Sequence, residues 1–439
     1  MKIEREIKKQ LISWKENSGR KPLVLQGARQ IGKTWLLKEF GRTEFEHLAY
    51  FSFDENPELK QFFQTTKDVK RIIQNLSLVY GKPILPGKTL IILDEIQECN
   101  EALNSLKYFC DNAPEYVVAS AGSLLGVALT RGESFPVGKV DFIDIHPLTF
   151  MEFLKAADAY LAAFCDDLLL SEPIPDLFFN SLVDKFKMYL ISGGMPEAVS
   201  ALLERQNIEK TQTVLSNILR ANSLDFSKHV DKNDIPKIGF IWASIPSQLA
   251  RENKKFLYQS VKPGARAREY EDALSWLTQA GLVHKIYRTS KPALPISGYD
   301  DLTAFKLYLY DVGLLRRMSL LDPIAIKEGD RLFVEFKGSL SENYILQSLI
   351  HQFEGTPRYW TSGNQAEVDF VLQYKNQIIP VEVKSGLSIR GKSLAFYQKQ
   401  FQPPVSIRFS MKNLRMDDRL LNLPLFLADH TRRFLNTIL

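Results

Sequence analysis

Short apolar runs alternate with stretches of helical periodicity along the first 150 residues. The apolar runs lie at residues 23–26, 48–53, 90–93, 116–119 and 140–145. Runs of this length are typical of buried strands, and helices between them cover both faces of a mostly parallel sheet. The pattern therefore predicts an α/β fold for this part of the chain.

The first apolar run leads into an octet that is specific for phosphate binding. Residues 27–34 read Gly-Ala-Arg-Gln-Ile-Gly-Lys-Thr, which fits the pattern G-x-x-x-x-G-K-[ST] at every fixed position. Glycines let the loop wrap closely around phosphates, while loop N–H groups and the next helix N-terminus point at the anion. Lys33 would reach the β- and γ-phosphates, and the Thr34 hydroxyl would ligate Mg²⁺. Residues 33–40 read as that helix, and Gly41 is expected to end it.

A pair of carboxylates ends the third apolar run. Asp94 and Glu95 stand directly after it, and the carboxyl ends of strands are where open α/β sheets bind ligands. We expect Asp94 to hold Mg²⁺ through a water and Glu95 to polarise the attacking water, so Lys33 and Glu95 are the predicted catalytic residues here. The predicted nucleotide contacts are Gly27, Ala28, Arg29, Gln30, Ile31, Gly32, Lys33, Thr34, Trp35, Asp94 and Ser123, and the predicted metal ligands are Thr34 and Asp94.

Two serines follow the run at residues 116–119, at Ser120 and Ser123. A small polar side chain at this point could sense the γ-phosphate of a bound nucleotide. It could equally cap the next helix. The sequence leaves both interpretations open.

The rest of the chain divides into three further predicted parts after a core at residues 1–150. Residues 151–205 are helical in pattern and rich in leucine and alanine, which suggests a helical lid. Residues 206–325 contain two predicted helices and then an alternating strand, the order of a winged helix-turn-helix. Residues 326–439 read as a helix followed by two strands joined by a turn. Basic residues between the two middle helices could contact nucleic-acid phosphates or form a solvated face: Lys254, Lys255, Lys262, Arg266 and Arg268.

Acidic residues and a lysine in the last part favour a second metal site. Glu342 lies on the predicted helix and Asp369 on the first strand, while Glu382 and Lys384 share one face of the second strand. Pairing of the strands would bring Asp369 and Glu382 together. Carboxylates that hold Mg²⁺ beside a lysine suit phosphodiester hydrolysis. Glu342, Asp369 and Glu382 are therefore the predicted ligands. Glu382 and Lys384 are the predicted catalytic residues, and an ordinary solvated hairpin is the alternative.

Composition restricts the classes of function. Of 439 residues, 45% are hydrophobic and 24% charged, which is an ordinary globular composition. The net charge of +5 permits nucleic-acid contact without requiring it. The three cysteines lack the spacing of a zinc site and suit a reducing cytoplasm. No stretch approaches ~18 uninterrupted apolar residues, and the N-terminus lacks an apolar signal core, so we expect a cytoplasmic protein without membrane contact.

These motifs resemble those of bacterial and archaeal AAA-type ATPases that carry a C-terminal domain of unknown function. The likeness rests on residues 27–34, 93–97, 147–153 and 193–196 and extends over nearly the whole chain. It implies an AAA-like core, a winged-helix middle and a C-terminal domain similar to PD-(D/E)XK nucleases. It also implies nucleotide roles for the octet and its acidic pair, and nuclease-like roles for the four C-terminal residues. Val368 stands before Asp369 where the name of that nuclease class has a proline.

The leading hypothesis is an ATPase that uses ATP and Mg²⁺ and acts on nucleic acid or is regulated by it. The two candidate sites together motivate it, with DNA contacted through the winged-helix and nuclease-like parts. The alternative is an ATP-gated switch that binds a protein partner and carries an inactive nuclease-like domain. Assembly into a homo-oligomer is left open by the sequence.

Overall fold

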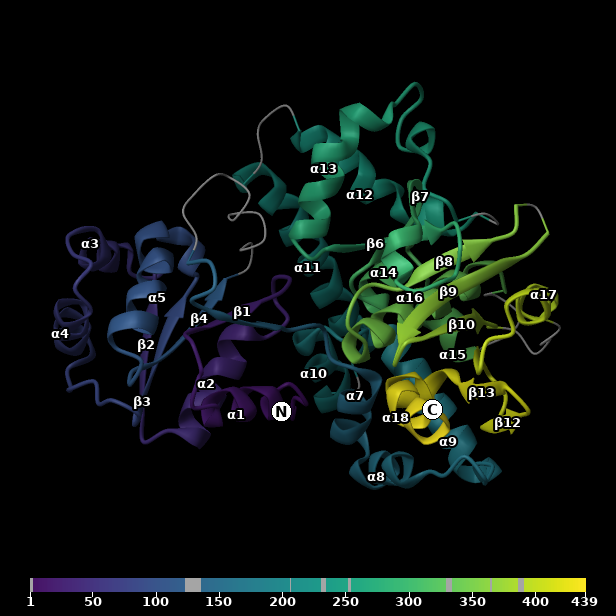
Figure 1. Cartoon of the computed structure of the whole chain (residues 1–439), viewed down its shortest axis with the longest axis horizontal. Helices are drawn as coiled ribbons and strands as arrows, with labels where there is room; N and C mark the ends of the chain where they lie inside the picture. The colour runs from purple at the N-terminus through teal and green to yellow at the C-terminus, as the bar shows by residue number, and fades with distance from the viewer. Residues whose placement is uncertain are drawn as a thin grey trace. The chain divides into compact units, whose positions relative to one another are not determined.

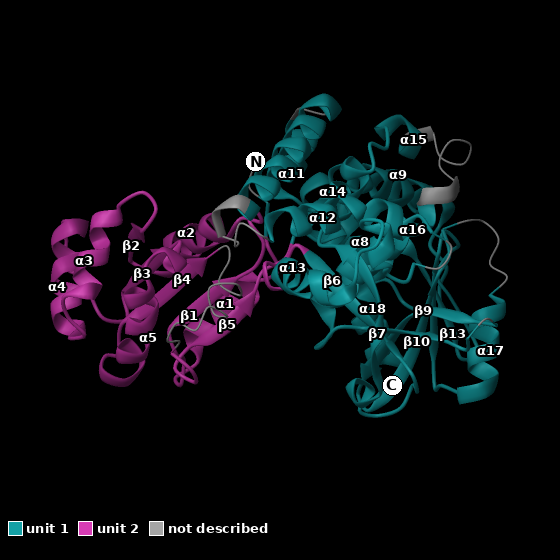
Figure 2. Ribbon diagram, turned by 90° about the horizontal axis from the view of Figure 1, so that it is seen from above, with its two compact units in different colours: residues 1–4, 147–278, 283–439 teal, residues 5–146, 279–282 magenta. Residues whose placement is uncertain are grey.

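The structure is a computed structural model, which describes residues 3–122, 136–205, 207–229, 234–251, 254–328, 334–363, 365–385 and 391–439. Two compact units are distinguished by their internal contacts (Figure 2). The small unit consists of residues 5–146 and 279–282, and the large unit of residues 1–4, 147–278 and 283–439. The octet thus lies in the small unit, and the predicted acidic site lies in the large unit.

A parallel sheet forms the centre of the small unit. Over the described residues it has five strands in the order β2-β3-β4-β1-β5, and every neighbouring pair is parallel (Figure 1). The carboxyl ends of the strands therefore meet at one edge. β4 separates β1, which leads into the octet, from β3, which ends at Asp94. The predicted α/β fold is confirmed, with β1 (Leu23–Gln26), β2 (His47–Ser52), β3 (Thr89–Asp94), β4 (Val117–Gly122) and β5 (Asp141–Asp144).

The helices of the small unit bury apolar stripes in the core of the unit. In α4 the Asp68 side chain caps the first turn and left-handed Gly81 ends the helix. Its apolar residues at helical spacing are buried in the core of the unit: Val69, Ile72, Ile73 and Leu76. The helices are α1 (Lys8–Glu16), α2 (Lys33–Glu44), α3 (Lys60–Gln64), α4 (Val69–Tyr80) and α5 (Asn100–Asn112), with 3-10 turns η1 (Pro57–Leu59) and η2 (Ile96–Glu98).

The prediction that Gly41 ends the helix after the octet is wrong. α2 continues through Gly41 to Glu44 and packs on β2, β3 and β4. A Cβ added at Gly41 would lie 2.6 Å from Leu48 Cδ1 and 3.2 Å from Leu90 Cδ2. The glycine therefore allows close approach of helix and sheet rather than a change of backbone direction.

The large unit has a mixed sheet. In the part of the chain that the structure describes, its eight strands run in the order β12-β13-β11-β10-β9-β8-β6-β7. β9 and β10 form the predicted hairpin, and the two residues that join them, Lys375 and Asn376, both have positive φ, as a tight hairpin turn requires. The strands are β6 (Val283–Thr289), β7 (Asp300–Leu309), β8 (Arg358–Thr361), β9 (Glu367–Tyr374), β10 (Gln377–Val383), β11 (Ser406–Ser410), β12 (Arg415–Asp417) and β13 (Leu420–Pro424).

Helices surround this sheet, and α16 and α17 both contact β10. The first helices are α7 (Phe150–Ala157), α8 (Ala159–Asp167), α9 (Asp176–Ser192), α10 (Pro196–Arg205), α11 (Ile208–His229), α12 (Ile235–Leu249) and α13 (Ala267–Gln279). The later helices are α14 (Val312–Met318), α15 (Pro323–Glu328), α16 (Val334–Gln352), α17 (Lys392–Phe401) and α18 (Thr431–Ile438). The 3-10 turns are η3 (Tyr258–Ser260), η4 (Ile296–Tyr299) and η5 (Leu425–His430).

A helix–helix–hairpin order is present in the middle of the chain. It consists of α12, α13 and the antiparallel pair β6–β7. The hairpin also joins the sheet of the last part of the chain, because β6 pairs with β8 through Arg288 and Thr289. The two parts predicted as separate domains at residues 206–325 and 326–439 thus share one sheet, and the four-part division of the chain stays a prediction.

The Gly193-Gly194 pair is explained by a close contact with the start of α14. Gly193 has a φ of 63°, and a Cβ there would lie 2.2 Å from Asp311 Oδ1. The Gly194 N–H donates to Asp311 Oδ2 at 2.7 Å, and Gly313 is equally crowded by the backbone of Ser192. Only residues without a side chain allow this approach, so the pair joins α9 to α14 as well as separating α9 from α10.

Candidate functional site

The octet folds into a loop whose backbone needs glycine. Gly27, Gln30 and Gly32 have φ values of 151°, 61° and 91°. A Cβ added at Gly27 would lie 2.3 Å from the carbonyl oxygen of Ile145. α2 starts at Lys33, directly after left-handed Gly32. The loop therefore joins the end of β1 to the N-terminus of a helix, the arrangement that binds phosphates.

The Lys33 side chain folds back into this loop. Its Nζ donates to the carbonyl oxygens of Gly27 at 2.9 Å and Ala28 at 2.7 Å. Burial lowers the pKa of Lys33 to about 8, although the nearby charges of Glu95 and Asp94 oppose the shift. The ammonium thus already lies where the loop wraps, and a phosphate would give it a charged partner in place of neutral carbonyl oxygens.

Asp94 and Thr34 meet across the sheet edge. The Thr34 hydroxyl donates to Asp94 Oδ2 at 2.8 Å, and the Tyr50 hydroxyl donates to the same oxygen at 2.9 Å. Burial raises the pKa of Asp94, while these two hydrogen bonds oppose it. A hydroxyl beside a carboxylate is a donor set that suits Mg²⁺, so the residues present fit this ion.

Glu95 has an unusual backbone and a fixed side chain. Its φ of 51° places a residue with a side chain in the left-handed region directly after β3. Its Oε2 accepts from Gln97 Nε2 at 2.5 Å. Strained backbone of this kind gathers at functional sites. The Glu95 carboxylate therefore has a defined position next to Asp94.

The other predicted nucleotide contacts that the structure describes lie in the loop or directly after it. Trp35 is 43% exposed at the start of α2, whereas Ala28 and Ile31 are buried. Ser123 lies outside the described residues. The Ser120 hydroxyl donates to the carbonyl oxygen of Leu23 at 2.9 Å, so this serine links β4 to β1 inside the sheet.

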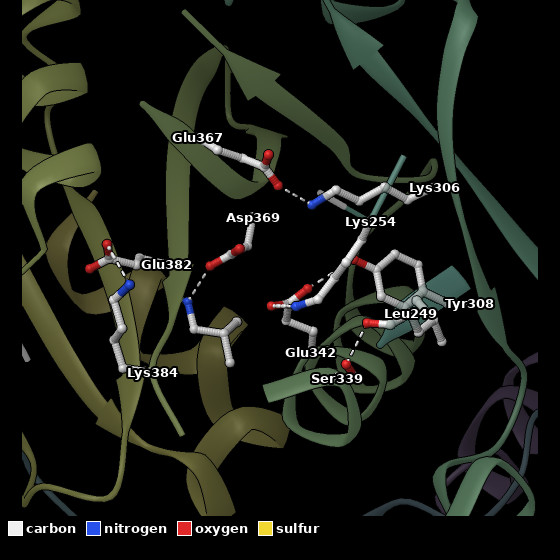
Figure 3. Close-up of polar contacts among 11 residues, drawn as sticks. Leu249, Lys254, Lys306, Tyr308, Ser339, Glu342, Glu367, Asp369, Glu382 and Lys384 are labelled. Carbon is white, nitrogen blue, oxygen red and sulfur yellow. Dashed lines mark hydrogen bonds and ion pairs between the residues drawn. The ribbon is translucent and has the colours of Figure 1, made fainter. Parts of the chain in front are cut away.

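The predicted acidic residues of the large unit come from three elements (Figure 3). Glu342 lies on α16, Asp369 on β9 and Glu382 on β10. Asp369 Oδ2 accepts from the Val383 N–H at 2.8 Å. The Glu382 carboxylate instead contacts two cations, with Lys384 Nζ 3.3 Å from Oε1 and Arg408 Nε donating to Oε2 at 3.1 Å.

Two lysines from the middle of the chain enter the same region. Lys254 forms an ion pair with Glu342, and the Tyr308 hydroxyl donates to the other Glu342 oxygen at 3.1 Å. Burial opposes ionisation of Glu342, but the charges of Lys254 and Lys306 outweigh it and lower its pKa. Burial first, and then the charge of Glu342, raise the pKa of Asp369 to about 7.

The second lysine is wholly enclosed. The Lys306 side chain is 0% exposed and forms an ion pair with Glu367, whose side chain is 32% exposed. The Lys306 ammonium also lies 4.8 Å from the ring centroid of Tyr359. Glu342 and Asp369 add further negative charge around it. Lys306 is therefore an internal counter-ion for carboxylates on β9 and α16.

The acidic site does not assemble as a three-carboxylate cluster. Over the residues that the structure describes, no group of three or more His, Cys, Asp or Glu side chains is placed to hold a metal ion. Figure 3 shows Glu382 paired with Lys384 and Glu342 paired with Lys254. The other Glu382 oxygen is paired with Arg408. As it stands, this donor set does not fit a divalent cation.

Sequence reasoning missed several partners of these residues. Tyr50 and Gln97 hold the acidic pair of the small unit, and Lys254, Lys306, Tyr308 and Arg408 hold the carboxylates of the large unit. Lys306 could have been identified from the sequence as a candidate buried charge, since it is the one charged residue in the apolar stretch at residues 304–309. The others meet their partners only through the fold.

The described helices include none that is long and apolar enough to cross a membrane. Comparison with protein families gives three matches: an AAA domain at residues 19–154, a domain of unknown function (DUF8612) at residues 183–325 and another (DUF4143) at residues 337–426. An uncharacterized protein of Methanocaldococcus jannaschii is 25% identical over 231 residues, which cover 48% of this chain. The match covers 46% of that protein, so the chain spans about half the length of this relative.

Among solved structures, the Walker-type ATPase of Pyrococcus abyssi matches 72% of this chain and 96% of its own, with 15% identity and a TM-score of 0.46. A RuvB variant of Thermotoga maritima matches 67% of this chain and 91% of its own, with 16% identity and a TM-score of 0.30. The family matches agree with the parallel sheet, the loop at residues 27–34 and the acidic pair after β3. The chain therefore carries an AAA-type P-loop ATPase domain at residues 19–154, joined to a C-terminal domain of unknown function at residues 337–426.

Proposed function

We propose that this protein hydrolyses ATP with Mg²⁺ at residues 27–34 and uses the nucleotide state to control a C-terminal domain that binds or cuts nucleic acid. The observation that carries the proposal is the 2.8 Å hydrogen bond between Thr34 and Asp94, beside the buried Lys33 ammonium. Three groups from two elements thus converge at one sheet edge. Each has the chemistry that a bound nucleotide with its metal ion requires.

Each side chain has a separate role in this reaction. The loop N–H groups and Lys33 would bind the phosphates and stabilise the negative charge that develops on them. Thr34 and Asp94 would hold Mg²⁺, which supplies charge neutralisation between the β- and γ-phosphates. Glu95 would accept a proton from the attacking water, and Gln97 would keep the Glu95 carboxylate in place.

Variants of the small unit test these roles. Lys33→Ala should abolish ATP turnover because the phosphates lose their buried cation. Glu95→Gln keeps shape and hydrogen bonding but removes the base, so turnover should fall by about 10²–10⁴-fold while ATP still binds. Gln97→Ala should lower turnover less than Glu95→Gln does. Turnover that survives Lys33→Ala would refute the assignment of the site.

Exposed basic residues support contact with nucleic acid. Lys262, Arg266 and Arg268 are exposed on the connection into α13 and at its start. Exposed cations of this kind suit nucleic-acid phosphates. Double replacement of Arg266 and Arg268 by Ala should weaken DNA binding and flatten its salt dependence.

A second candidate function is an ATP-gated switch that binds a protein partner in the cytoplasm. It is favoured by apolar side chains on and after α8 and on α9 that stay exposed: Tyr160 at 92%, Leu169 at 62% and Leu177 at 74%. It is also favoured by the pairing of the three predicted metal ligands of the large unit, Glu342, Glu382 and Asp369, with a cation or a backbone N–H. ATP turnover that ignores DNA and responds to replacement of these apolar residues would select this function.

A further inference from the structure

Arg5 connects the phosphate loop to the chain that follows the neighbouring strand β5. Its Nη1 donates to the carbonyl oxygen of Ile31, inside the octet, at 3.1 Å. Its Nη2 donates to the carbonyl oxygen of His146, two residues after β5, at 2.7 Å. Arg5 is only 6% exposed, although it precedes both α1 and the AAA domain at residues 19–154. A planar guanidinium with donors on separate nitrogens suits such a double contact.

The segment that Arg5 contacts after β5 is a fixed part of the sheet edge. The Ile145 N–H donates to the carbonyl oxygen of Gln26 at 2.9 Å, which continues the pairing of β5 with β1. Ile145 also lies against Gly27, where an added Cβ would be 2.3 Å from the Ile145 carbonyl oxygen. The sheet therefore holds the start of the loop. Arg5 holds a later point of the loop, at Ile31, to the same segment.

The direction of the Ile31 carbonyl decides the direction of an N–H group in the loop. A trans peptide unit is planar, so its C=O and N–H point in opposite directions. Because the Ile31 carbonyl oxygen is turned to Arg5, the Gly32 N–H of the same peptide unit points away from Arg5. Loop N–H groups are the donors that would receive phosphates. Gly32 has a φ of 91°, and a glycine restricts rotation of this peptide unit little, so an external contact is needed to fix it.

We propose that Arg5 is a positioning residue for the nucleotide, because it fixes the Ile31–Gly32 peptide unit with the Gly32 N–H directed at the phosphates before the nucleotide binds. A donor that is already in place does not have to be ordered when the ligand arrives, so the affinity is higher. The inference rests on the proposed function, since it supposes that residues 27–34 bind a nucleotide. It adds to the site a residue from outside the octet.

ADP binding measures this role without turnover. Isothermal titration calorimetry of the full chain with ADP and Mg²⁺ compares Arg5→Met with Arg42→Met, which removes an exposed arginine on α2 of the same unit. Both variants lose one positive charge, so a difference between them does not come from net charge. Lys33→Ala should not bind ADP and identifies the site that is measured. Circular dichroism confirms the fold of each variant.

Arg5→Met should bind ADP roughly 10- to 100-fold more weakly than Arg42→Met does, since one hydrogen bond to a charged phosphate contributes a factor of that size. Arg5→Lys keeps the charge and one donor nitrogen and should recover part of the loss. In the nucleotide-free protein, amide hydrogens of residues 27–34 should exchange faster in Arg5→Met than in Arg42→Met. A role confined to overall stability would instead raise exchange throughout the small unit.

Equal ADP affinity in Arg5→Met and Arg42→Met, with binding abolished by Lys33→Ala, would overturn the inference and leave the proposed nucleotide site intact. If Arg5→Met fails to fold, the comparison of Arg5→Gln with Arg42→Gln decides in the same way, because glutamine is neutral and has one donor nitrogen. ADP binding that is unchanged in Lys33→Ala would refute the assigned nucleotide site, and the role of Arg5 with it.

Discussion

Replacing Lys306 with Met would remove a cation from the interior of the large unit and keep a side chain of similar length. Lys306 lies on β7, its side chain is 0% exposed, and its ammonium pairs with Glu367 on β9. Burial by itself would lower the pKa of Lys306, but the charges of Glu367, Glu342 and Asp369 raise it overall. The substitution leaves three carboxylates with one lysine, Lys254, in direct contact.

The expected loss of stability follows from the exposure of the two partners. Removing one partner of a buried ion pair costs about 3–5 kcal/mol. Glu367 is 32% exposed and can recover part of its hydration, so we expect the lower end, about 3 kcal/mol. For a unit of about 290 residues, ~3 kcal/mol corresponds to a fall of roughly 5 °C in melting temperature.

The loss should also depend on pH. Burial and the charge of Glu342 raise the pKa of Asp369 to about 7, while Lys306 opposes the shift. A carboxyl whose folded-state pKa is raised contributes stability at low pH that is lost as pH rises through that pKa. Without Lys306 the pKa of Asp369 rises further, so the loss continues above about pH 7. Lys306→Met should therefore cost more stability at about pH 8 than at about pH 6.

Thermal unfolding followed by calorimetry measures this effect. Lys155→Met is a matched control, because Lys155 belongs to the same unit and its ion pair with Glu4 has side chains that are 57% and 67% exposed. An exposed pair is worth under about 1 kcal/mol. Equal melting temperatures for Lys306→Met and Lys155→Met would refute the reasoning, as would a loss that shrinks as pH rises.

Four further predictions concern other parts of the chain. Since burial lowers the pKa of Lys33 to about 8, ATP affinity should fall by about tenfold per pH unit above that value, and a flat titration profile would contradict this. Gly391→Ala should destabilise the large unit by about 1–3 kcal/mol, since its Cβ would lie 2.4 Å from Glu382 Oε2. Gly239→Ala should stabilise the unit by about 0.5–1 kcal/mol, since nothing lies within 4 Å of that Cβ. Chemical denaturation measures both changes, and a stabilising Gly391→Ala or a destabilising Gly239→Ala would contradict the corresponding prediction. Burial raises the pKa of Asp429 to about 6, so stability from this group is lost as pH rises through that value. In the wild-type protein the melting temperature should fall as pH rises toward about 6, and Asp429→Asn should make this fall smaller. An unchanged dependence of melting temperature on pH in Asp429→Asn would show that another group causes the fall.

The nucleotide site could be predicted from the sequence because its chemistry is local. The octet needs its residues at fixed spacing, and a strand that ends in two carboxylates places them at the sheet edge whatever its neighbours are. The partners of these residues are not local. Tyr50 reaches Asp94 because β2 pairs with β3 in a register that places Ser52 opposite Asp94. No spacing along the chain encodes that pairing.

The acidic site of the large unit shows more clearly what the sequence pattern cannot predict. Alternation along β10 predicts that Glu382 and Lys384 lie on one face. The 3.3 Å contact between Lys384 Nζ and Glu382 Oε1 agrees with this prediction. Arg408, however, comes from the parallel neighbour β11, and Lys254 comes from a different part of the chain. A pattern of acids and a lysine on strands therefore identified the residues but not the counter-ions that now surround them. Gly41 in α2 is a second example. The sequence predicts a helix end at this glycine, but its role is to allow close packing on Leu48 and Leu90, which lie on β2 and β3.

ATP turnover with Mg²⁺, measured while single- and double-stranded DNA are titrated, tests the central claim most directly. Lys33→Ala serves as the blank, because it removes the buried cation of the phosphate loop. We predict turnover that is absent in Lys33→Ala and that rises strongly with DNA, since the nucleotide state is proposed to control a nucleic-acid-directed domain. Turnover that is lost in Lys33→Ala but unchanged by either form of DNA would contradict that coupling. It would leave an ATPase that acts as a switch for a protein partner.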